Sequence, residues 1–398
     1  MKIDIHSLET YNELARDGAE SAADALSELA DVPARVEMTD VSLMSSSDLR
    51  YEFDGRTFAG VSVSLGSPLS GETVLVFDED GREAITSNLV PAAGPERLES
   101  AVVEVGNIMA NGFVSGWADH LDTKIDVSPP SPVEGDGASV LPDPTTADDE
   151  YVFVFRSRVR SADSDVDFRI LLFPAIDALE ELLEDRTGEG ISLEKLEVFT
   201  EMTKQGAVRA TDNLTAMTGL ETTVEVNRLN FVSIPDIPAQ VGTEQRVGTA
   251  VKYTGSPSGY LAILFQPASA RRNVDALLSN EHDGDWSERE RSALEELCNV
   301  TASGFIDGWA NVLETSIRHS PPTFISDMGS SIVSPLIADL GRTDNYAFVL
   351  DSTIETEDAD SLQCQLLALP RRDELEEALE ALLVERVTET RADPDDHF

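Results

Sequence analysis

Apolar positions along the chain follow two different periods. Over residues 8–29 and again over 95–121 they recur at helical spacing, which predicts two long amphipathic helices. Short apolar stretches bounded by turn residues predict strands between and after these helices. The stretches are residues 35–38, 57–65, 72–77, 151–159 and 168–173. A third, shorter helix is predicted at 176–184, and the Ser-, Pro- and Gly-rich residues 128–149 are expected to form a loop.

The whole pattern then occurs a second time. Asn107 has its counterpart in Asn299, 192 residues later, and the glycines and apolar segments around it match at offsets from 188 to 196. Small loop insertions produce such a drift. The boundary between the copies falls in the stretch 187–190, which contains two glycines. The sequence therefore predicts an internal duplication, with one domain at 1–188 and a second at 189–398.

Each copy also divides into two similar halves, and each half opens with a long helix and continues into strands. Two amphipathic helices on one face of an antiparallel sheet bury the apolar positions of both kinds of element. The predicted fold class is therefore α/β, more narrowly α+β. We expect two tandem domains, each a pseudo-twofold repeat with two long helices packed on an antiparallel sheet.

The charge balance narrows the choice of partners. The chain has 75 acidic residues against 29 Lys and Arg, a formal net charge of -46. Such a surface repels nucleic acid and anionic membranes, so neither is an expected partner. No apolar run approaches the roughly 18–20 residues of a transmembrane helix. The first residues show no basic region followed by an apolar stretch, so we expect a cytoplasmic protein.

Cysteine and histidine chemistry is sparse. Cys298 and Cys364 are the only cysteines, which excludes a disulfide framework and a Cys-rich zinc site, and we expect both thiols to be buried. The five histidines are scattered, without metal-ligand spacing. The sequence has no Gly-rich nucleotide loop, no nucleophile elbow and no zinc-binding helix motif. The remaining candidate chemistry lies on the second long helix of each copy.

One polar pattern stands at the same place in both copies. It consists of a serine, a glutamate four residues on, an asparagine three further on, and a proline after 22 intervening residues. Its members are Ser100, Glu104, Asn107 and Pro130 in the first copy, and Ser292, Glu296, Asn299 and Pro322 in the second. At helical periodicity the first three lie on one face of their helix. Because the neighbouring positions are small or apolar, we expect this face to point outward.

The pattern, together with Gly-Asn-Ile at 106–108, resembles the signature of the CheC, CheX and FliY phosphatases, which dephosphorylate the chemotaxis response regulator CheY. The resemblance covers nearly the whole chain, in two copies. It implies a chemotaxis signal-transduction hydrolase of the CheC-like kind. The first helices keep Glu13 and Glu201 but have Arg16 and Lys204 where the asparagine belongs. The active site is therefore not carried onto those two helices.

The resemblance implies a role for each residue of the pattern. The asparagines would orient a water for in-line attack on the aspartyl phosphate, because a carboxamide can accept from water and donate to neighbours without ionising. The glutamates would dock on a basic side chain of CheY near the phosphoryl group. The catalytic residues are thus expected to be Glu104, Asn107, Glu296 and Asn299. The supporting residues are expected to be Ser100, Pro130, Ser292 and Pro322.

The implied cofactor and partners follow from the same resemblance. No nucleophile, base or bound cofactor is needed on this chain, because the Mg²⁺ belongs to CheY. Phosphorylated CheY is the expected partner, and the deamidase CheD is a further candidate. The alternative is a non-catalytic adaptor that binds CheY, CheD or archaellum switch components. An intact glutamate and asparagine in both copies favour the enzyme.

The charge also predicts a salt requirement. The acids are spread along the whole chain, which favours a self-repelling folded surface over an acidic tail. At about 1 M salt the Debye length falls to about 3 Å, which removes most of this repulsion and points to an archaeal host with a salt-rich cytoplasm. We therefore expect the folded fraction, measured by far-UV circular dichroism, to rise from low to multimolar KCl. A folded spectrum that does not change over that range would contradict the prediction.

Overall fold

The computed structural model describes residues 2–3, 5–30, 33–89, 95–121, 123–142, 151–161, 167–175, 177–178, 191–278, 284–356 and 363–382. The chain forms two compact units, Met1–Gly190 and Ile191–Phe398. The repeat predicts a boundary between residues 188 and 189, inside a stretch, 179–190, that lies outside the described residues. Within the described ranges, no helix is both long and apolar enough to cross a bilayer.

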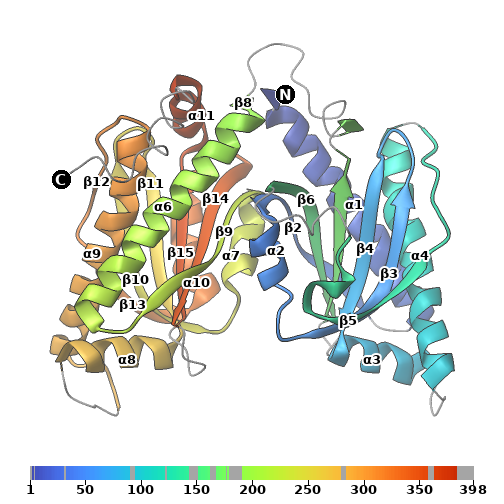
Figure 1. Ribbon diagram of the computed structural model, residues 1–398, viewed down its shortest axis with the longest axis horizontal. Helices are drawn as coiled ribbons and strands as arrows, with labels where there is room; N and C mark the ends of the chain where they lie inside the picture. Colours follow the sequence, from blue (N-terminus) through green and yellow to red (C-terminus); the bar gives the residue numbers. More distant parts are fainter. Residues whose placement is uncertain are drawn as a thin grey trace. The chain divides into compact units, whose positions relative to one another are not determined.

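The first unit alternates long helices with runs of strands (Figure 1). Its first half contains β1 (Lys2–Ile3), α1 (Ile5–Ala30), β2 (Ala34–Ser45), α2 (Ser46–Tyr51), β3 (Thr57–Leu65), β4 (Gly71–Asp78) and α3 (Glu79–Leu89). Its second half contains α4 (Pro95–His120), β5 (Ser131–Asp136), the 3₁₀ turn η1 (Gly137–Val140), β6 (Tyr151–Ser161) and β7 (Asp167–Pro174).

The second unit repeats this order. Its first half contains β8 (Ile191–Ser192), α6 (Leu193–Thr218), β9 (Thr222–Ser233), η3 (Ile234–Asp236), α7 (Ile237–Val241), β10 (Gln245–Thr254), β11 (Gly259–Phe265) and α8 (Pro267–Leu278). Its second half contains α9 (Glu288–Val312), β12 (Arg318–His319), β13 (Thr323–Met328), α10 (Gly329–Leu340), β14 (Tyr346–Thr356), β15 (Gln363–Pro370) and α11 (Arg372–Ala381).

Each sheet has the twofold order that the half-copies predict. In the first unit the strands run β5-β3-β4-β7-β6-β2, all antiparallel, so that β5-β3-β4 mirrors β2-β6-β7 about the β4–β7 pair. In the second unit the order is β13-β10-β11-β15-β14-β9, with β12 also beside β10. The predicted fold class, two long helices on an antiparallel sheet in each of two tandem units, is confirmed.

The paired helices approach each other through glycine. A methyl group on Gly116 of α4 would lie 2.9 Å from the Cα of Gly18 on α1, and one on Gly308 of α9 would lie 2.6 Å from the Cα of Gly206 on α6. Since the obstructing atoms are backbone, the helices pack at a distance that only glycine permits. Trp117 and its counterpart Trp309 are almost fully buried.

The outer strand pair of each unit carries a buried ion pair whose signs are reversed between the copies. In the first unit Asp40 on β2 lies opposite Arg156 on β6, and Arg156 Nε donates to Asp40 Oδ1 at 2.9 Å. In the second unit Arg228 on β9 lies opposite Asp351 on β14, and Arg228 Nη2 donates to Asp351 Oδ2 at 2.5 Å. Asp40 is fully buried and Asp351 is 1% exposed. Both units therefore have a charge pair at this place in the fold, although the acidic and the basic residue have exchanged strands.

Two expectations need correction, and a third lies mostly outside the described residues. The strand expected at 35–38 continues to Ser45, because Asp40 and other polar side chains are buried in the sheet and interrupt the apolar pattern. The loop expected at 128–149 contains β5 and η1. Since β5 is an edge strand with mostly exposed side chains, it shows no apolar alternation. Of the helix expected at 176–184, the described residues include only 177–178, which are helical.

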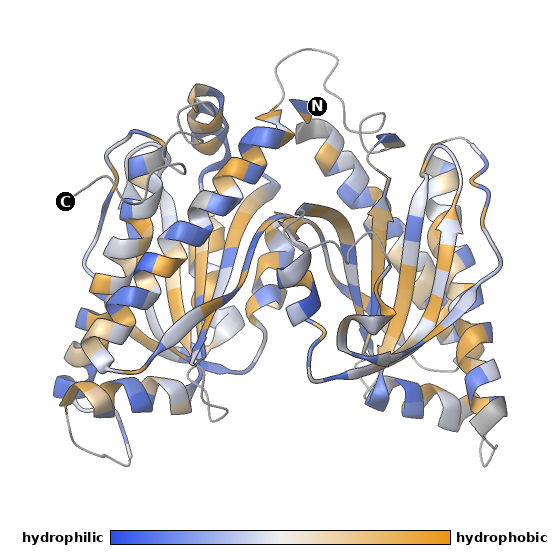
Figure 2. Cartoon of the chain, in the orientation of Figure 1, coloured by the Kyte–Doolittle hydropathy of each residue, from blue (hydrophilic) through white to orange (hydrophobic). Residues whose placement is uncertain are grey.

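The second unit also covers the other face of its sheet. There α7 and α10 pack their apolar residues on alternate positions of β9, β11, β14 and β15. In the first unit the place of α10 is taken by the short turn η1. Apolar strands therefore lie between helices whose outer faces are polar (Figure 2).

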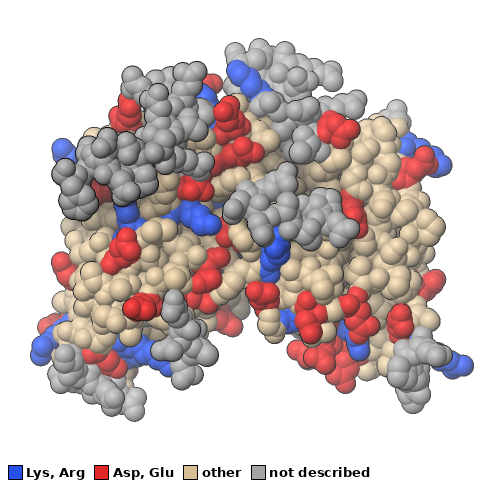
Figure 3. All heavy atoms as spheres, viewed as in Figure 1, with Lys and Arg blue, Asp and Glu red and all other residues tan. Residues whose placement is uncertain are grey.

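Acidic side chains lie over the surface of both units (Figure 3). Among the described residues, the buried acids are Asp40, Asp48, Asp236, Glu290 and Asp351. The remaining described acids whose exposure is given are at least partly open to solvent. This distribution is the one that makes the compact state repel itself at low salt.

The glycine crossing yields a prediction. We expect Gly308→Ala to lower the free energy of unfolding by about 1–3 kcal/mol, because the new methyl group overlaps backbone of α6. The higher helix propensity of alanine, worth about 1 kcal/mol, opposes the loss. Val208→Ala, at a position on α6 that is 44% exposed, is the control and should change little. Denaturant unfolding in multimolar KCl measures both, and a Gly308→Ala protein as stable as the control would contradict the prediction.

The reversal of the ion pair between the two units yields a second stability prediction. Asp351→Arg sets two guanidinium groups opposite each other in a buried position, and we expect a loss of about 3–5 kcal/mol. Adding Arg228→Asp restores opposite charges in the arrangement of the first unit, so the double variant should regain most of that loss. Lys124→Ala, which removes an exposed pair with Asp126, should cost under about 1 kcal/mol. A double variant as unstable as the sum of the single variants would argue against this account.

Candidate functional site

The first set of pattern residues lies along one exposed face of α4. Ser100 and Glu104 are exposed and Asn107 is half-buried, while Val105 and Met109 on the inner face are fully buried. Gly106 sits directly over β3, since a methyl group there would lie 2.7 Å from Cγ2 of Val61. The helix thus buries one side on the sheet and presents the predicted trio outward.

The second set repeats this geometry on α9. Ser292 and Glu296 are exposed and Asn299 is half-buried. The residue before Asn299 is Cys298, which is fully buried beside Thr249 of β10, the counterpart of Val61. Burial raises the pKa of Cys298 to about 12. The thiol is therefore protonated at neutral pH and is not a nucleophile beside Asn299.

The start of α9 is set by a capping box. Ser287 accepts a hydrogen bond from the backbone N–H of Glu290 at 3.4 Å, and the Glu290 carboxylate accepts one from the backbone N–H of Ser287 at 2.6 Å. Arg271 of α8 holds Glu290 from the other side at 2.8 Å. These contacts define the first turn, and the pattern residues follow at fixed helical positions from it.

The two prolines are placed by identical backbone ties. Ser128 Oγ accepts from the N–H of Ser64 at 3.0 Å, and the N–H of Ser128 donates back to the Ser64 carbonyl at 2.9 Å. Ser320 makes the same pair of bonds with Lys252, at 3.1 and 2.8 Å. Pro130 and Pro322 each stand two residues later, half-buried. Each proline is therefore carried to the sheet edge beneath the site helix.

In the second unit the structure brings all four predicted residues together. An open pocket with a volume of about 430 Å³ is lined by Ser292, Glu295, Glu296, Asn299, His319, Pro321 and Pro322. Within the described chain, neither Glu296 nor the carboxamide of Asn299 has a hydrogen bond from its side chain. Both groups are therefore open to an incoming molecule.

Sequence reasoning missed three lining residues of this pocket. Glu295 accepts a hydrogen bond from the backbone N–H of Phe324 at 2.9 Å, so it ties α9 to β13. His319 lies on β12 opposite Tyr253, and its Nε2 is 3.0 Å from Ser303 Oγ. Pro321 precedes the predicted proline. Adjacency to Glu296 and Pro322 was the available signal for Glu295 and Pro321, but the sequence does not tell which neighbours of a motif face the same side, and it gave no signal for His319.

The surroundings of Asn107 in the first unit differ from those of Asn299 in the second. Asn111, one turn further along α4, donates from Nδ2 to Oδ1 of Asn107 at 3.2 Å and to the Asn107 carbonyl at 2.8 Å. Ser303 takes the corresponding place in the second unit and donates only to the carbonyl of Asn299, at 2.9 Å. The carboxamide oxygen of Asn107 thus already has a partner, whereas that of Asn299 does not.

The first helices of the units have a different surface. Arg16 pairs with Glu20 one turn on, at 3.3 Å. On α6, burial and the neighbouring charge of Glu194 raise the pKa of Glu197. Arg16 on α1 and Lys204 on α6 stand where the pattern has asparagine, so these two helices lack the carboxamide that α4 and α9 present.

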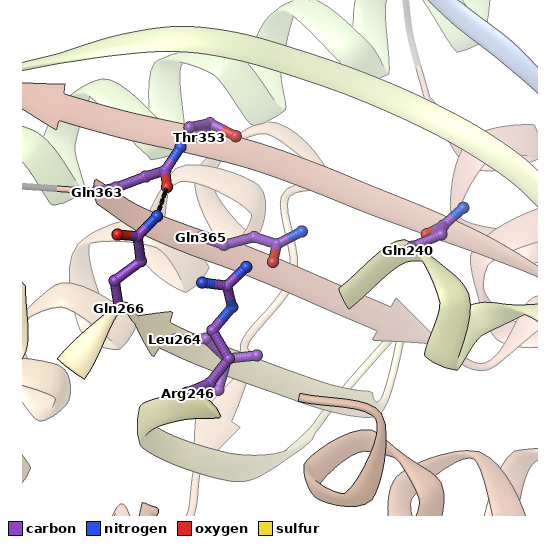
Figure 4. Close-up of a pocket in the computed structure, with 7 residues that line it drawn as sticks. All are labelled: Gln240, Arg246, Leu264, Gln266, Thr353, Gln363 and Gln365. Atoms are coloured by element: carbon purple, nitrogen blue, oxygen red, sulfur yellow. Dashed lines mark hydrogen bonds between the residues drawn. The ribbon is translucent and has the colours of Figure 1, made fainter. Parts of the chain in front are cut away.

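A second pocket of the second unit offers different chemistry (Figure 4). It lies on the sheet and is lined by Arg246, Leu264, Thr353 and four glutamines, Gln240, Gln266, Gln363 and Gln365. The Gln266 amide donates to Gln363, whose own amide donates to Glu355. Its lining includes no carboxylate, imidazole or thiol, so it supplies no acid–base or nucleophilic group.

Metal binding by the chain itself has no candidate in the described ranges. No group of three or more His, Cys, Asp or Glu side chains there is arranged to hold an ion.

Comparison with known proteins gives two family matches. The model of the CheC-like family matches residues 99–134, and the model of the chemotaxis phosphatase CheX matches residues 247–342. Each stretch contains one complete set of pattern residues, from its serine to its proline.

Individual relatives each match about half of the chain. A protein of Halobacterium salinarum (strain ATCC 29341 / DSM 671 / R1), provisionally named the CheY-P phosphatase CheC1, is 32% identical over 182 residues, which are 45% of this chain and 92% of the relative. The CheY-P phosphatase CheC of Bacillus subtilis (strain 168) is 20% identical over 200 residues, 48% of this chain and 96% of that protein. The crystal structure of Thermotoga maritima FliY is 20% identical, covers 46% of this chain and 96% of its own, and has a TM-score of 0.38. Since the Halobacterium relative is matched over nearly its whole length, the chain belongs to the CheC-like family.

Proposed function

We propose that the chain hydrolyses the aspartyl phosphate of phosphorylated CheY in the cytoplasm. The observation that carries the proposal is the pocket on α9, where Glu296 and Asn299 face one open space together with Ser292 and Pro322. The names of two relatives support the same reaction, since CheC is named a CheY-P phosphatase and CheC1 is provisionally named one.

The reaction needs little from this chain beyond positioning. Water attacks the phosphorus, the bond from phosphorus to the aspartyl oxygen breaks, and inorganic phosphate and a free carboxylate result. The carboxamide of Asn299 accepts a hydrogen bond from the water and holds it in line. Asn107 does the same in the first unit. The Mg²⁺ that offsets the phosphoryl charge is supplied by the partner, and the two asparagines act without ionising.

The glutamates serve to orient the partner. Glu104 and Glu296 are exposed carboxylates one helical turn before the asparagines, so each can accept a charge-assisted hydrogen bond from a Lys or Arg beside the phosphoryl group. Such a bond fixes the distance between asparagine and phosphorus. Ser100 and Ser292, a further turn back, and the prolines support the rim of each site.

The alternative proposal is an adaptor that binds CheY or CheD without turnover. The same exposed helix faces would serve as the docking surface. The two proposals differ in one observable, because only the enzyme releases phosphate.

Loss of the carboxamides tests the proposal. In multimolar KCl, the chain should accelerate the loss of phosphate from a phosphorylated CheY of a salt-adapted archaeon. We expect the double variant Asn107→Ala with Asn299→Ala to lose about 10²-fold of this acceleration, because water positioning is the main catalytic contribution. Each single variant reports on the other site alone.

The control is Asn311→Ala, an exposed asparagine three turns beyond Asn299 on α9, which should leave the rate unchanged. If the wild-type chain bound phosphorylated CheY but did not accelerate phosphate release, the enzyme proposal would be refuted and the adaptor proposal would remain.

A further inference from the structure

The two copies place different residues at one position of the site rim. In the first unit Val127 bridges to Leu65 at the end of β3. In the second unit His319 pairs with Tyr253 at the matching end of β10. His319 lines the pocket that contains Glu296 and Asn299. An aliphatic side chain and an imidazole therefore occupy equivalent places in the two copies.

The hydrogen bonds of His319 link its protonation to Asn299. Nδ1 lies 3.0 Å from the carbonyl of Ser320, and because a carbonyl only accepts, Nδ1 carries a proton. Nε2 lies 3.0 Å from Ser303 Oγ, whose single proton is donated to the Asn299 carbonyl at 2.9 Å. When Ser303 donates to Asn299, Nε2 can bond to Ser303 only by donating, which requires a ring that carries both protons. A neutral ring instead accepts the Ser303 proton, and the bond to Asn299 is lost.

A positive charge on His319 affects phosphoryl binding because the other charged groups that line the pocket are carboxylates. On α9, the carboxylates of Glu295 and Glu296 line the pocket with His319, and the guanidinium of Arg291 lies over the ring of Phe324. The nearby cations Arg318 and Lys252 are sequence neighbours of the paired residues His319 and Tyr253, so strand alternation directs them to the other face of the sheet. Among the lining residues, His319 alone can carry a positive charge. A phosphoryl group that enters beside two carboxylates is opposed by them and favoured by the imidazolium.

We propose that His319 is a positioning residue that makes hydrolysis at the second site depend on pH, while the first site lacks this dependence. The inference rests on the proposed function. Imidazole changes charge between about pH 5 and 8. Below this transition the charge is present and Ser303 holds the Asn299 carbonyl. As the pH rises, both contributions disappear and the second site slows. At the first site, Val127 and the bond from Asn111 to Asn107 do not titrate.

The test uses proteins with one working site each. Asn107→Ala leaves the second site and Asn299→Ala leaves the first. Phosphate release from phosphorylated CheY is measured from pH 5.5 to 8.5 and divided by the rate of the same substrate alone. We expect the Asn107→Ala protein to lose about fivefold of its acceleration as the pH rises, the size of one exposed ion pair. The Asn299→Ala protein should show a flat profile and serves as the internal control.

Two variants in the Asn107→Ala background identify the group. His319→Val introduces the residue type of the first copy, and His319→Gln keeps hydrogen bonding without charge. Both should flatten the profile at its high-pH level. A pH dependence that persists in His319→Gln, or equal profiles for the two single-site proteins, would overturn the inference while the proposed function stands. No acceleration by the wild-type chain at any pH would overturn the proposed function, and this inference with it.

Discussion

The contact between helix backbones at glycine sets the position of the helix that carries the serine, glutamate and asparagine of each site. Where Gly116 meets Gly18, α4 cannot turn about its axis or move away without losing a contact that no other residue can form. A second side of the same helix is held on the sheet by Gly106 over Val61. With two sides occupied, one face remains for solvent, and Asn107 stands on it. The second unit keeps the helix crossing and places a buried thiol over a threonine where the first has glycine over valine.

On this shared framework the two copies have diverged in what surrounds the asparagine. The first copy binds the carboxamide of Asn107 from within its own helix, through Asn111. The second leaves the carboxamide of Asn299 open and directs its hydrogen bonds to the backbone carbonyl instead. Duplication therefore preserved the placement of one functional group and varied its local environment. Two sites on one chain can in this way differ in activity, although the residues that define the pattern are the same in both.

The sequence predicts most of the fold, and the reason for each failure is physical. Long helices and short apolar strands follow from periodicity. Buried charge at Asp40 hides the continuation of β2 beyond residue 38, because pattern arguments treat polar residues as exposed. The edge strand β5 buries too little to show a period. In the site, helical spacing placed Ser292, Glu296 and Asn299 on one face, but His319 reaches it from a distant strand. Contacts of that kind depend on the sheet register, which the sequence pattern does not specify. The catalytic roles remain predictions.

Tandem copies of one fold risk exchanging equivalent strands while they fold. The reversed ion pairs oppose this error. If β2 paired with β14 in the register of β9, Asp40 would face Asp351, and if β9 paired with β6, Arg228 would face Arg156. The first mispairing would enclose two carboxylates at positions that are closed to water in the correct fold, and the second would set two guanidinium groups opposite each other. A chain that carried the same ion pair in both copies would accept either strand equally well. The inversion of the ion pair thus favours strand pairing within each unit over pairing between equivalent strands of the two units.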